Sequence, residues 1–329
     1  NIFKLCIPVA IENLLHMSVF IVDAVMVGRL GTDALAAVGL AGTLFFTISM
    51  VFSSLSVGSA SIIARHIGAK EKEIAQVVGS QAVLMSLVLG IVVTPFLLIF
   101  AEQMLVLMSA ETQVSALGKS YLQIVGGFFA FRMIILACNG ILRGAGDTKT
   151  PMKVTIIINC INILFNWLLI FGIGPFPGLG VAGAAWATAI SYTIGAVMLC
   201  TKLFTGRCVL HISISRIIRV HFESVKRIIH ISVPAAIDAF LTQIGFLFFA
   251  KIVAILGTVP LAAHQIAIRI ESISFMPGFA LAVSTATLVG QSIGAKNVNL
   301  ALLSMRRSCY FAMALMGFFA FIFLIFPGQ

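Results

Sequence analysis

Three polar side chains stand in apolar stretches of this sequence and are of the types that bind a small cation. Asp23 lies in the first apolar run, fifteen residues after Pro8, and Asn162 and Asn166 are four residues apart in a later run, on one face of a helix. A carboxylate with two amide oxygens suits a hard cation such as Na⁺, and a buried carboxylate can instead carry a proton. We therefore predict a cation site at these three residues, for Na⁺ or H⁺. The alternative is a carboxylate at the outer end of its helix that pairs with Arg29 or water.

Two further carboxylates follow a proline at the same spacing. Glu12 comes four residues after Pro8, and Asp238 comes four residues after Pro234. The shared position predicts a shared role: either both line a central cavity and contact a substrate, or both hold the inner ends of helices together. Pro8 removes a backbone hydrogen bond from its helix, which favours a hinge near the inner end of that helix.

Gln265 and Glu271 lie in another apolar run and are candidates for the lining of the same cavity. Ionisable side chains inside apolar helices are costly, which makes Glu271 a candidate for attracting a cationic substrate. A buried structural role for Glu271 and an interhelical hydrogen bond for Gln265 are the alternatives.

The elements that carry these residues are predicted to be membrane-spanning helices. Sixty per cent of the residues are hydrophobic and ten per cent are charged, and the mean hydropathy is +1.13, which excludes an ordinary soluble domain. The apolar runs are continuous, as in helices, and do not alternate as barrel strands do. Each is long enough to cross a hydrocarbon core of roughly 30 Å. The nine runs lie near residues 3–28, 34–64, 74–100, 117–142, 152–173, 180–204, 226–256, 261–293 and 302–326.

The chain contains an internal repeat with a period of 226 residues. The stretch from Pro8 to Lys70 aligns without a gap on the stretch from Pro234 to Lys296, with about a third of the positions identical. Two related helical bundles in one chain are typical of a transporter that rocks one half against the other. We expect roughly a hundred further residues to complete the second copy. The predicted fold is all-α and polytopic, with a six-helix lobe over 1–204, a linker over 205–221 and the first three helices of a second lobe over 222–329.

Lysine and arginine are concentrated in alternate loops, and the intervening loops carry almost none. Cytoplasmic loops of membrane proteins carry such an excess, so the N-terminus and the basic loops are predicted to be cytoplasmic. This topology explains the net charge of +10, and no nucleic-acid partner is needed. The linker, which is basic and polar, is expected to lie as an amphipathic segment on the inner membrane surface.

Several short segments identify a family. They are GDTKTPM at 146–152, in which Thr150 could cap the next helix and Pro151 suits its first turn; LGVAGAAWAT at 179–188; AAHQIA at 262–267; and an LGT-x-x-LAA element at 30–37 and 256–263. Together they resemble the MATE (multidrug and toxic compound extrusion) family, and the resemblance covers the whole chain. It implies two six-helix lobes around a V-shaped cavity, and drug export driven by inward flow of Na⁺ or H⁺.

The resemblance also implies roles for individual residues. Members of the family carry an aspartate at the Asp23 position and polar residues matching Asn162 and Asn166, as a cation site of the N-terminal lobe. Some have an aspartate where this chain has Asn166. Some carry a carboxylate in the second lobe where this chain has Thr242 and Gln243, so the resemblance does not imply a second cation site here.

The predicted function is secondary antiport: export of organic, cationic drugs or metabolites in exchange for Na⁺ or H⁺, by a monomer in the bacterial cell membrane. No organic cofactor is expected. A lipid-linked saccharide flippase of the same superfamily is the alternative within transport; the internal acids, Asp23 among them, favour cationic cargo. A membrane-embedded lipid-modifying enzyme is a third possibility, but the HExxH, GxSxG and P-loop motifs are absent from the sequence.

Overall fold

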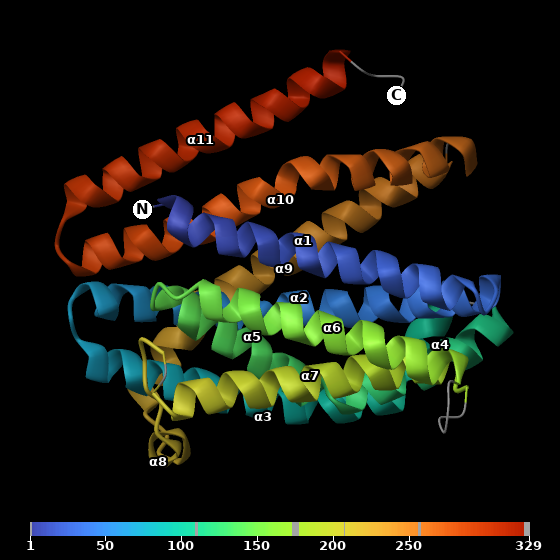
Figure 1. Ribbon diagram of the computed structural model, residues 1–329, viewed down its shortest axis with the longest axis horizontal. Helices are drawn as coiled ribbons and strands as arrows, with labels where there is room; N and C mark the ends of the chain where they lie inside the picture. Colours follow the sequence, from blue (N-terminus) through green and yellow to red (C-terminus); the bar gives the residue numbers. More distant parts are fainter. Residues whose placement is uncertain (1, 109–110, 173–177, 207, 256–257, 326–329) are drawn as a thin grey trace.

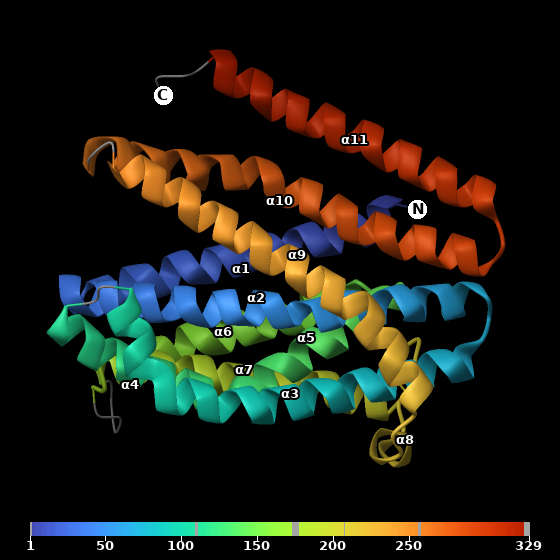
Figure 2. The same cartoon turned by 180° about the vertical axis from the view of Figure 1, so that it is seen from behind.

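The computed structural model is built almost wholly from helices, and it describes residues 2–108, 111–172, 178–206, 208–255 and 258–325. The first lobe contains seven of them: α1 (Ile2–Gly28), α2 (Thr32–Gly68), α3 (Lys72–Leu107), α4 (Thr112–Gly127), α5 (Phe129–Gly144), α6 (Lys149–Phe171) and α7 (Val181–Phe204). The linker contains α8 (Ile214–Ile218). The second part contains α9 (Phe222–Ile255), α10 (Thr258–Gly294) and α11 (Val298–Ile325). Figures 1 and 2 show the long helices running roughly along one axis.

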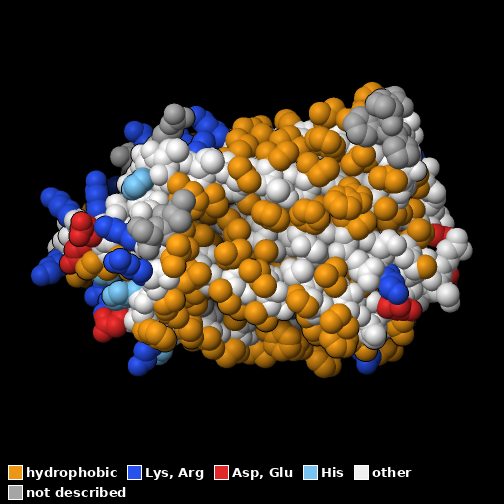
Figure 3. All heavy atoms as spheres, turned by 90° about the horizontal axis from the view of Figure 1, so that it is seen from below, with side chains coloured by type: hydrophobic (Ala, Val, Ile, Leu, Met, Phe, Trp, Pro, Cys, Tyr) orange, Lys and Arg blue, Asp and Glu red, His pale blue; other side chains and the backbone are white. Residues whose placement is uncertain are grey.

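The long helices confirm the predicted polytopic membrane fold. In the part of the chain that is described, eight helices are long and apolar enough to cross a membrane, or nine if α4 and α5 are counted as one span. Figure 3 shows apolar side chains across the middle of one face and most of the Lys and Arg side chains at one end. This end carries the α2–α3 and α10–α11 turns, as Figure 1 shows, and it is the inner end in the topology predicted above.

One predicted span is broken. The run near 117–142 was expected as a single helix, but α4 and α5 meet at Phe128 with a bend of 53°. Gly126 and Gly127 close α4, and a Cβ atom on Gly126 would approach Leu97 of α3 to 2.9 Å. The bend therefore lies where two glycines weaken the helix and where α3 packs closely against it.

The two copies of the repeat end in the same turn. Lys70 after α2 and Lys296 after α10 both have positive φ, at 64° and 56°. In each turn the next backbone amide donates to a carbonyl of the last helical turn. Glu71 donates to the His66 carbonyl at 2.9 Å, and Asn297 donates to the Ser292 carbonyl at 2.9 Å. Equivalent positions of the repeat therefore share an unusual backbone conformation. Gly257, the repeat equivalent of Gly31, lies outside the described residues.

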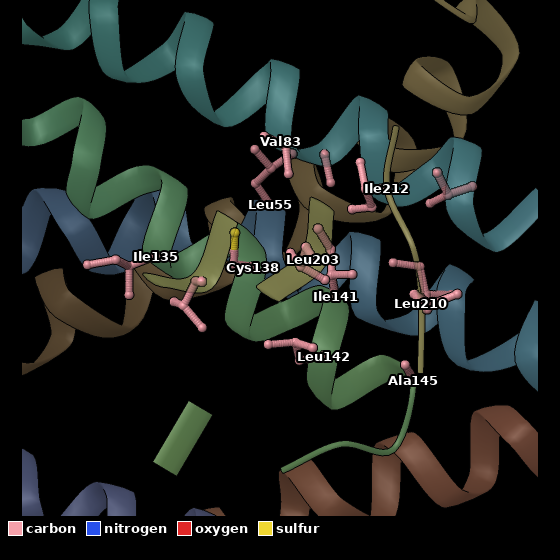
Figure 4. Packing of buried hydrophobic residues seen from close by; sticks show 14 of the residues in the cluster. Leu55, Val83, Ile135, Cys138, Ile141, Leu142, Ala145, Leu203, Leu210 and Ile212 are labelled. Atoms are coloured by element: carbon pink, nitrogen blue, oxygen red, sulfur yellow. The ribbon is translucent and has the colours of Figure 1, made fainter. Parts of the chain in front are cut away.

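Part of the linker packs into the first lobe. Leu210 and Ile212 are fully buried in a hydrophobic cluster of the first lobe. The same cluster contains Cys138, Ile141 and Leu142 of α5, as Figure 4 shows. Apolar side chains at these two positions bring the linker into the core of the first lobe.

Polar contacts fasten the same linker to α3. The side-chain amide of Gln81 donates to the carbonyls of Arg216 and Arg219 at 3.2 and 2.9 Å, and its oxygen accepts from the His221 amide at 3.2 Å. Arg216 in turn donates to Gln76 at 2.7 Å. Because Gln81 is fully buried, these bonds satisfy it, and the linker belongs to the first lobe.

The GDTKTPM loop is also capped differently from the expectation. Asp147 accepts hydrogen bonds from the Thr150 amide at 3.0 Å and from the Thr150 hydroxyl at 2.7 Å. Asp147, one residue before the N-cap position Thr148, therefore accepts from the first turn of α6, and Thr150 is the donor to it. A carboxylate suits this position because helix N-termini favour negative charge.

The two lobes touch at their inner ends. Gly68 of α2 lies against the backbone of Gln291 of α10, and Gly294 of α10 lies against the backbone of Arg65, so closely that a Cβ atom on either glycine would overlap the opposing carbonyl. Thr287 and Gln291 of α10 also donate to the carbonyls of Arg143 and Gly144, both at 3.2 Å. Helices approach this closely only where small residues face each other.

The helices of the two lobes separate toward the outer end. In Figure 1, α9 and α10 approach α2 on the left and diverge from it toward the right, and Figure 2 shows the same divergence from behind. The space around three glycines is consistent with this divergence. A Cβ atom added to Gly39 or Gly42 of α2, or to Gly245 of α9, would have no atom within 4 Å. The lobes are thus closed at the inner end and spread at the outer end.

Candidate cation-binding site

The three residues of the predicted cation site lie together between α1 and α6. The amide nitrogen of Asn166 donates to Asp23 at 2.6 Å and to the Asn162 side-chain oxygen at 3.0 Å. Asn162 and Asn166 are both buried, and Asp23 is half-buried. Their spacing of four residues places both asparagines on the face of α6 that packs on α1. Asp23 pairs with Asn166 and makes no described ion pair with Arg29.

Thr188 of α7 extends this cluster, and sequence reasoning did not single it out. The Asn162 amide donates to the Thr188 hydroxyl at 3.4 Å, and that hydroxyl donates to the Ala184 carbonyl at 3.0 Å. Thr188 closes the LGVAGAAWAT segment, so it was quoted as part of a motif and not as a ligand. The one available signal was its place in that motif.

The cluster presents oxygen ligands for a small cation. The Asp23 carboxylate, the Asn162 oxygen and the Thr188 hydroxyl lie along one chain of hydrogen bonds, and the side-chain oxygen of Asn166 is buried without a partner. Hard cations such as Na⁺ take carboxylate, amide and hydroxyl oxygens. With one carboxylate, the charge matches a monovalent ion, and the described residues contain no group of three His, Cys, Asp or Glu for a metal. The donor set therefore fits Na⁺ or a proton.

Glu12 does not line a cavity. Its side chain is fully buried, its carboxylate pairs with Arg143 of α5 at 2.7 Å, and Asn139 donates to it at 3.4 Å. The carboxylate is fully buried, the Arg143 side chain is partly exposed, and the pair ties α1 to α5. Of the two roles considered, this pairing favours the one in which Glu12 holds helices together inside the first lobe.

The other cavity candidates are not brought together. Asp238 on α9 and Glu271 on α10 are exposed, and the side chain of Gln265 lies outside the described residues. Gln243, at the position where some relatives carry a carboxylate, donates to Thr47 of α2 at 3.5 Å. Asp238 therefore does not share the burial of Glu12, despite the equivalent position in the repeat.

Pro8 lies inside α1, and the helix continues through it. The ring of Pro8 is buried, and the Lys4 carbonyl has no amide donor at position 8. Beside it, Cys6 and Val9 pack with Ala280 and Leu281 of α10. The inner part of α1 thus contacts the second lobe, whereas its outer part carries Asp23.

Comparison with known proteins places this geometry in a family. The MatE family profile matches residues 8–168 and 234–329. A protein of Thermotoga maritima named probable multidrug resistance protein NorM is 32% identical over 299 residues, which cover 90% of this chain and 64% of that protein. The Bacillus subtilis protein named uncharacterized transporter YisQ is 27% identical over 315 residues, which cover 96% of this chain and 69% of that protein. The chain thus spans a little under two thirds of the length of the Thermotoga relative.

Solved structures resemble this fold over nearly its whole length. A MOP superfamily transporter from Pyrococcus furiosus superposes with a TM-score of 0.90 at 28% identity, covering 99% of this chain and 72% of that one. A structure described as the outward-facing conformation of a multidrug resistance MATE family transporter gives the same TM-score, identity and coverage. A MATE structure in the bent conformation gives 0.91 at 29% identity, again with 99% and 72% coverage.

Proposed function

The chain belongs to the MatE family, the multidrug and toxic compound extrusion transporters, and we propose that it exports organic cations, as drugs or metabolites, in exchange for Na⁺ or H⁺. It is a multi-pass protein of the bacterial cell membrane. One observation carries the proposal: a half-buried carboxylate, Asp23, is held by Asn166 inside a membrane lobe, in a cluster whose oxygens are not all satisfied. Ionisable groups at such positions are costly and mark ion pathways.

The cation drives transport through its different affinity for two lobe arrangements. A ligand shifts an equilibrium between two states only by that difference, so the oxygens around Asp23 must be arranged differently when the lobes rock. Helix α1 connects the cation site to the second lobe, because it carries Asp23 toward its outer end and packs Cys6 and Val9 on α10 at its inner end. A movement of α1 would therefore reach both the cation site and the second lobe.

The lobe arrangement supports a state that is open to the outside. The glycine contacts of Gly68 and Gly294 close the inner end, and the helices diverge toward the outer end. In this state a cation arrives from outside as cargo leaves. Its entry stabilises the state in which the inner contact has opened, and release of the cation inside resets the cycle.

The alternatives have less support. The relatives compared above are a multidrug resistance protein and transporters by name, so neither they nor the family supports a lipid-modifying enzyme. The saccharide flippase lacks a specific observation in its favour. The protein is proposed to act as a monomer.

Transport by inside-out vesicles tests the proposal. Vesicles containing the full-length protein are loaded with Na⁺ or with acid, and uptake of a fluorescent organic cation is followed with each gradient alone. We expect one of the two gradients to drive dye uptake above that of vesicles without the protein. Dye uptake that depends on neither gradient, or that requires ATP, would contradict antiport.

A further inference from the structure

A cavity of about 470 Å³ lies between the two lobes at their inner end. The first turn of α1, the turn between α5 and α6, the linker and α10 all contribute to its lining, which consists of Lys4, Leu5, residues 145–149, Val209, Leu288 and Gln291. Gln291 belongs to the contact between the lobes, since it donates to the Gly144 carbonyl at 3.2 Å. Along α1, Lys4 and Asp23 are separated by roughly 28 Å at about 1.5 Å per residue. The cavity is therefore separate from the cation site, and both lobes build it.

Two lysines make this inner cavity positively charged. Lys4 and Lys149 have exposed side chains, and neither forms an ion pair with a described residue. Asp147, the acid among the lining residues, already accepts two hydrogen bonds from Thr150, at 3.0 and 2.7 Å. Its carboxylate is thus used within the turn. Two ammonium groups against one carboxylate leave the cavity with an excess of positive charge.

The hydroxyl of Thr148 has no partner in the same cavity. Thr148 is 2% exposed and lines the cavity, and its hydroxyl oxygen is buried without a hydrogen-bond partner among the described residues. A side chain at this N-cap position normally accepts a hydrogen bond from the amide two or three residues later. Here the Thr150 amide donates to Asp147, and Pro151 has no amide hydrogen. Buried hydroxyls are rarely left unpaired, and this one is available to donate to a bound molecule.

These groups fit a phosphate. Ammonium and hydroxyl groups donate hydrogen bonds to phosphate oxygens, and lysine is a common phosphate ligand. The cavity lies at the end of the molecule where most of the Lys and Arg side chains of Figure 3 gather, which is the cytoplasmic end in the predicted topology. Basic pockets between membrane helices on that side bind the headgroups of anionic lipids. Leu5, Val209 and Leu288 add apolar lining that suits the glycerol and acyl part of a phospholipid.

We propose that the inner cavity is a binding site for a phosphate group, held by Lys4, Thr148 and Lys149. Two kinds of molecule present this group at the inner end: an anionic phospholipid of the inner leaflet and a soluble phosphate ester of the cytoplasm. The site contains neither the coupling cation nor the cargo, so it goes beyond the proposed export function.

Three ligands test the proposal and separate the two sources. Phosphatidic acid carries the phosphate together with two acyl chains, glycerol 3-phosphate is the same headgroup without the chains, and phosphatidylcholine has the chains but no net charge. Binding of each to the purified full-length protein in a neutral detergent is measured by native mass spectrometry. We expect phosphatidic acid to bind roughly tenfold more tightly than phosphatidylcholine if a lipid is the source. Binding of glycerol 3-phosphate as tight as that of phosphatidic acid would identify the soluble ester.

Substitutions in the lining show whether the phosphate binds in this cavity. A lysine near anionic lipid contributes enough that Lys149→Gln should weaken binding of phosphatidic acid about fivefold, and the double variant with Lys4→Gln about 20- to 30-fold. Thr148→Val removes the hydroxyl, keeps the shape of the side chain and should weaken binding several-fold. Lys72→Gln is the matched control. Lys72 is also the exposed first residue of a helix at the inner end, but it is not among the lining residues, so its loss should not change binding.

Three results would overturn the proposal. The first is equal binding of phosphatidic acid and phosphatidylcholine without binding of glycerol 3-phosphate. The second is an equal effect of Lys149→Gln and Lys72→Gln, because the attraction would then come from the whole basic end and not from the cavity. The third is binding of neither phosphate compound. If Thr148→Val does not fold, the lysine variants decide the question, since both lysine side chains are exposed and their replacement leaves the packing intact.

Discussion

Asn166 donates a hydrogen bond of 2.6 Å to Asp23, which joins α6 to the outer part of α1. The inner part of the same helix packs Cys6 and Val9 against Ala280 and Leu281 of α10. One helix therefore connects the candidate cation site to the second lobe. Any change at Asp23 that moves α1 also acts on the contact between the lobes, and the following predictions depend on this connection.

Replacing Thr188 by valine should weaken cation coupling, because it removes the hydroxyl that accepts the Asn162 amide while keeping the shape of the side chain. We expect the cation concentration for half-maximal export to rise several-fold. Thr193→Val is the matched control: Thr193 lies on the same helix and also bonds a carbonyl one turn back, at 2.9 Å, but does not touch the cluster. Equal effects of the two substitutions would show that Thr188 has no special part in coupling.

Replacing Glu12 by glutamine should destabilise the first lobe. Arg143 would remain partly buried without its carboxylate, and breaking a buried pair on one side costs about 3–5 kcal/mol. The melting temperature of the purified protein should fall by several degrees. The double variant Glu12→Leu with Arg143→Met should recover much of the loss, because neither charge then remains buried. A single variant as stable as wild type would contradict the structural role of Glu12.

Replacing Pro8 by alanine should impair export while expression and folding stay near normal. Alanine restores the amide that position 8 lacks and so stiffens α1 between its contact with α10 and Asp23. Drug resistance of cells carrying the variant, normalised to protein level in the membrane, measures the effect. Full resistance at equal protein level would show that flexibility at Pro8 is dispensable.

Replacing Gly294 by leucine should prevent the inner ends of the lobes from closing, since any side chain there meets the Arg65 backbone. A cysteine at Thr287, in a protein lacking native cysteines, should then react faster with an impermeant thiol reagent in inside-out vesicles. Gly245→Leu is the control, because no atom lies within 4 Å of a Cβ at that position. Unchanged labelling in the Gly294 variant would refute the assignment of this contact as the inner closure.

Helix positions followed from hydropathy for all but one span, although α3 runs past its predicted end near residue 100 to Leu107. The bend at Phe128 could not be predicted, because an apolar run shows that a segment is hydrophobic but not the direction of its helix axis. No proline lies there to indicate a bend. Asp23, Asn162 and Asn166 stood out as polar residues in apolar helices. Thr188 did not, because a threonine in a membrane helix usually bonds its own backbone, as Thr188 also does. The pairing of Glu12 with Arg143 joins positions far apart in the chain, which no local spacing reveals.

The central claim is that Asp23 carries the charge that couples cation entry to export. The most direct test measures dye transport into inside-out vesicles under the driving gradient, with wild type, Asp23→Asn and Asn166→Ala side by side. We predict that Asp23→Asn abolishes gradient-driven transport, whereas Asn166→Ala lowers its rate without abolishing it, because only the first substitution removes the ionisable group. Gradient-driven transport at wild-type rates by Asp23→Asn would contradict the account.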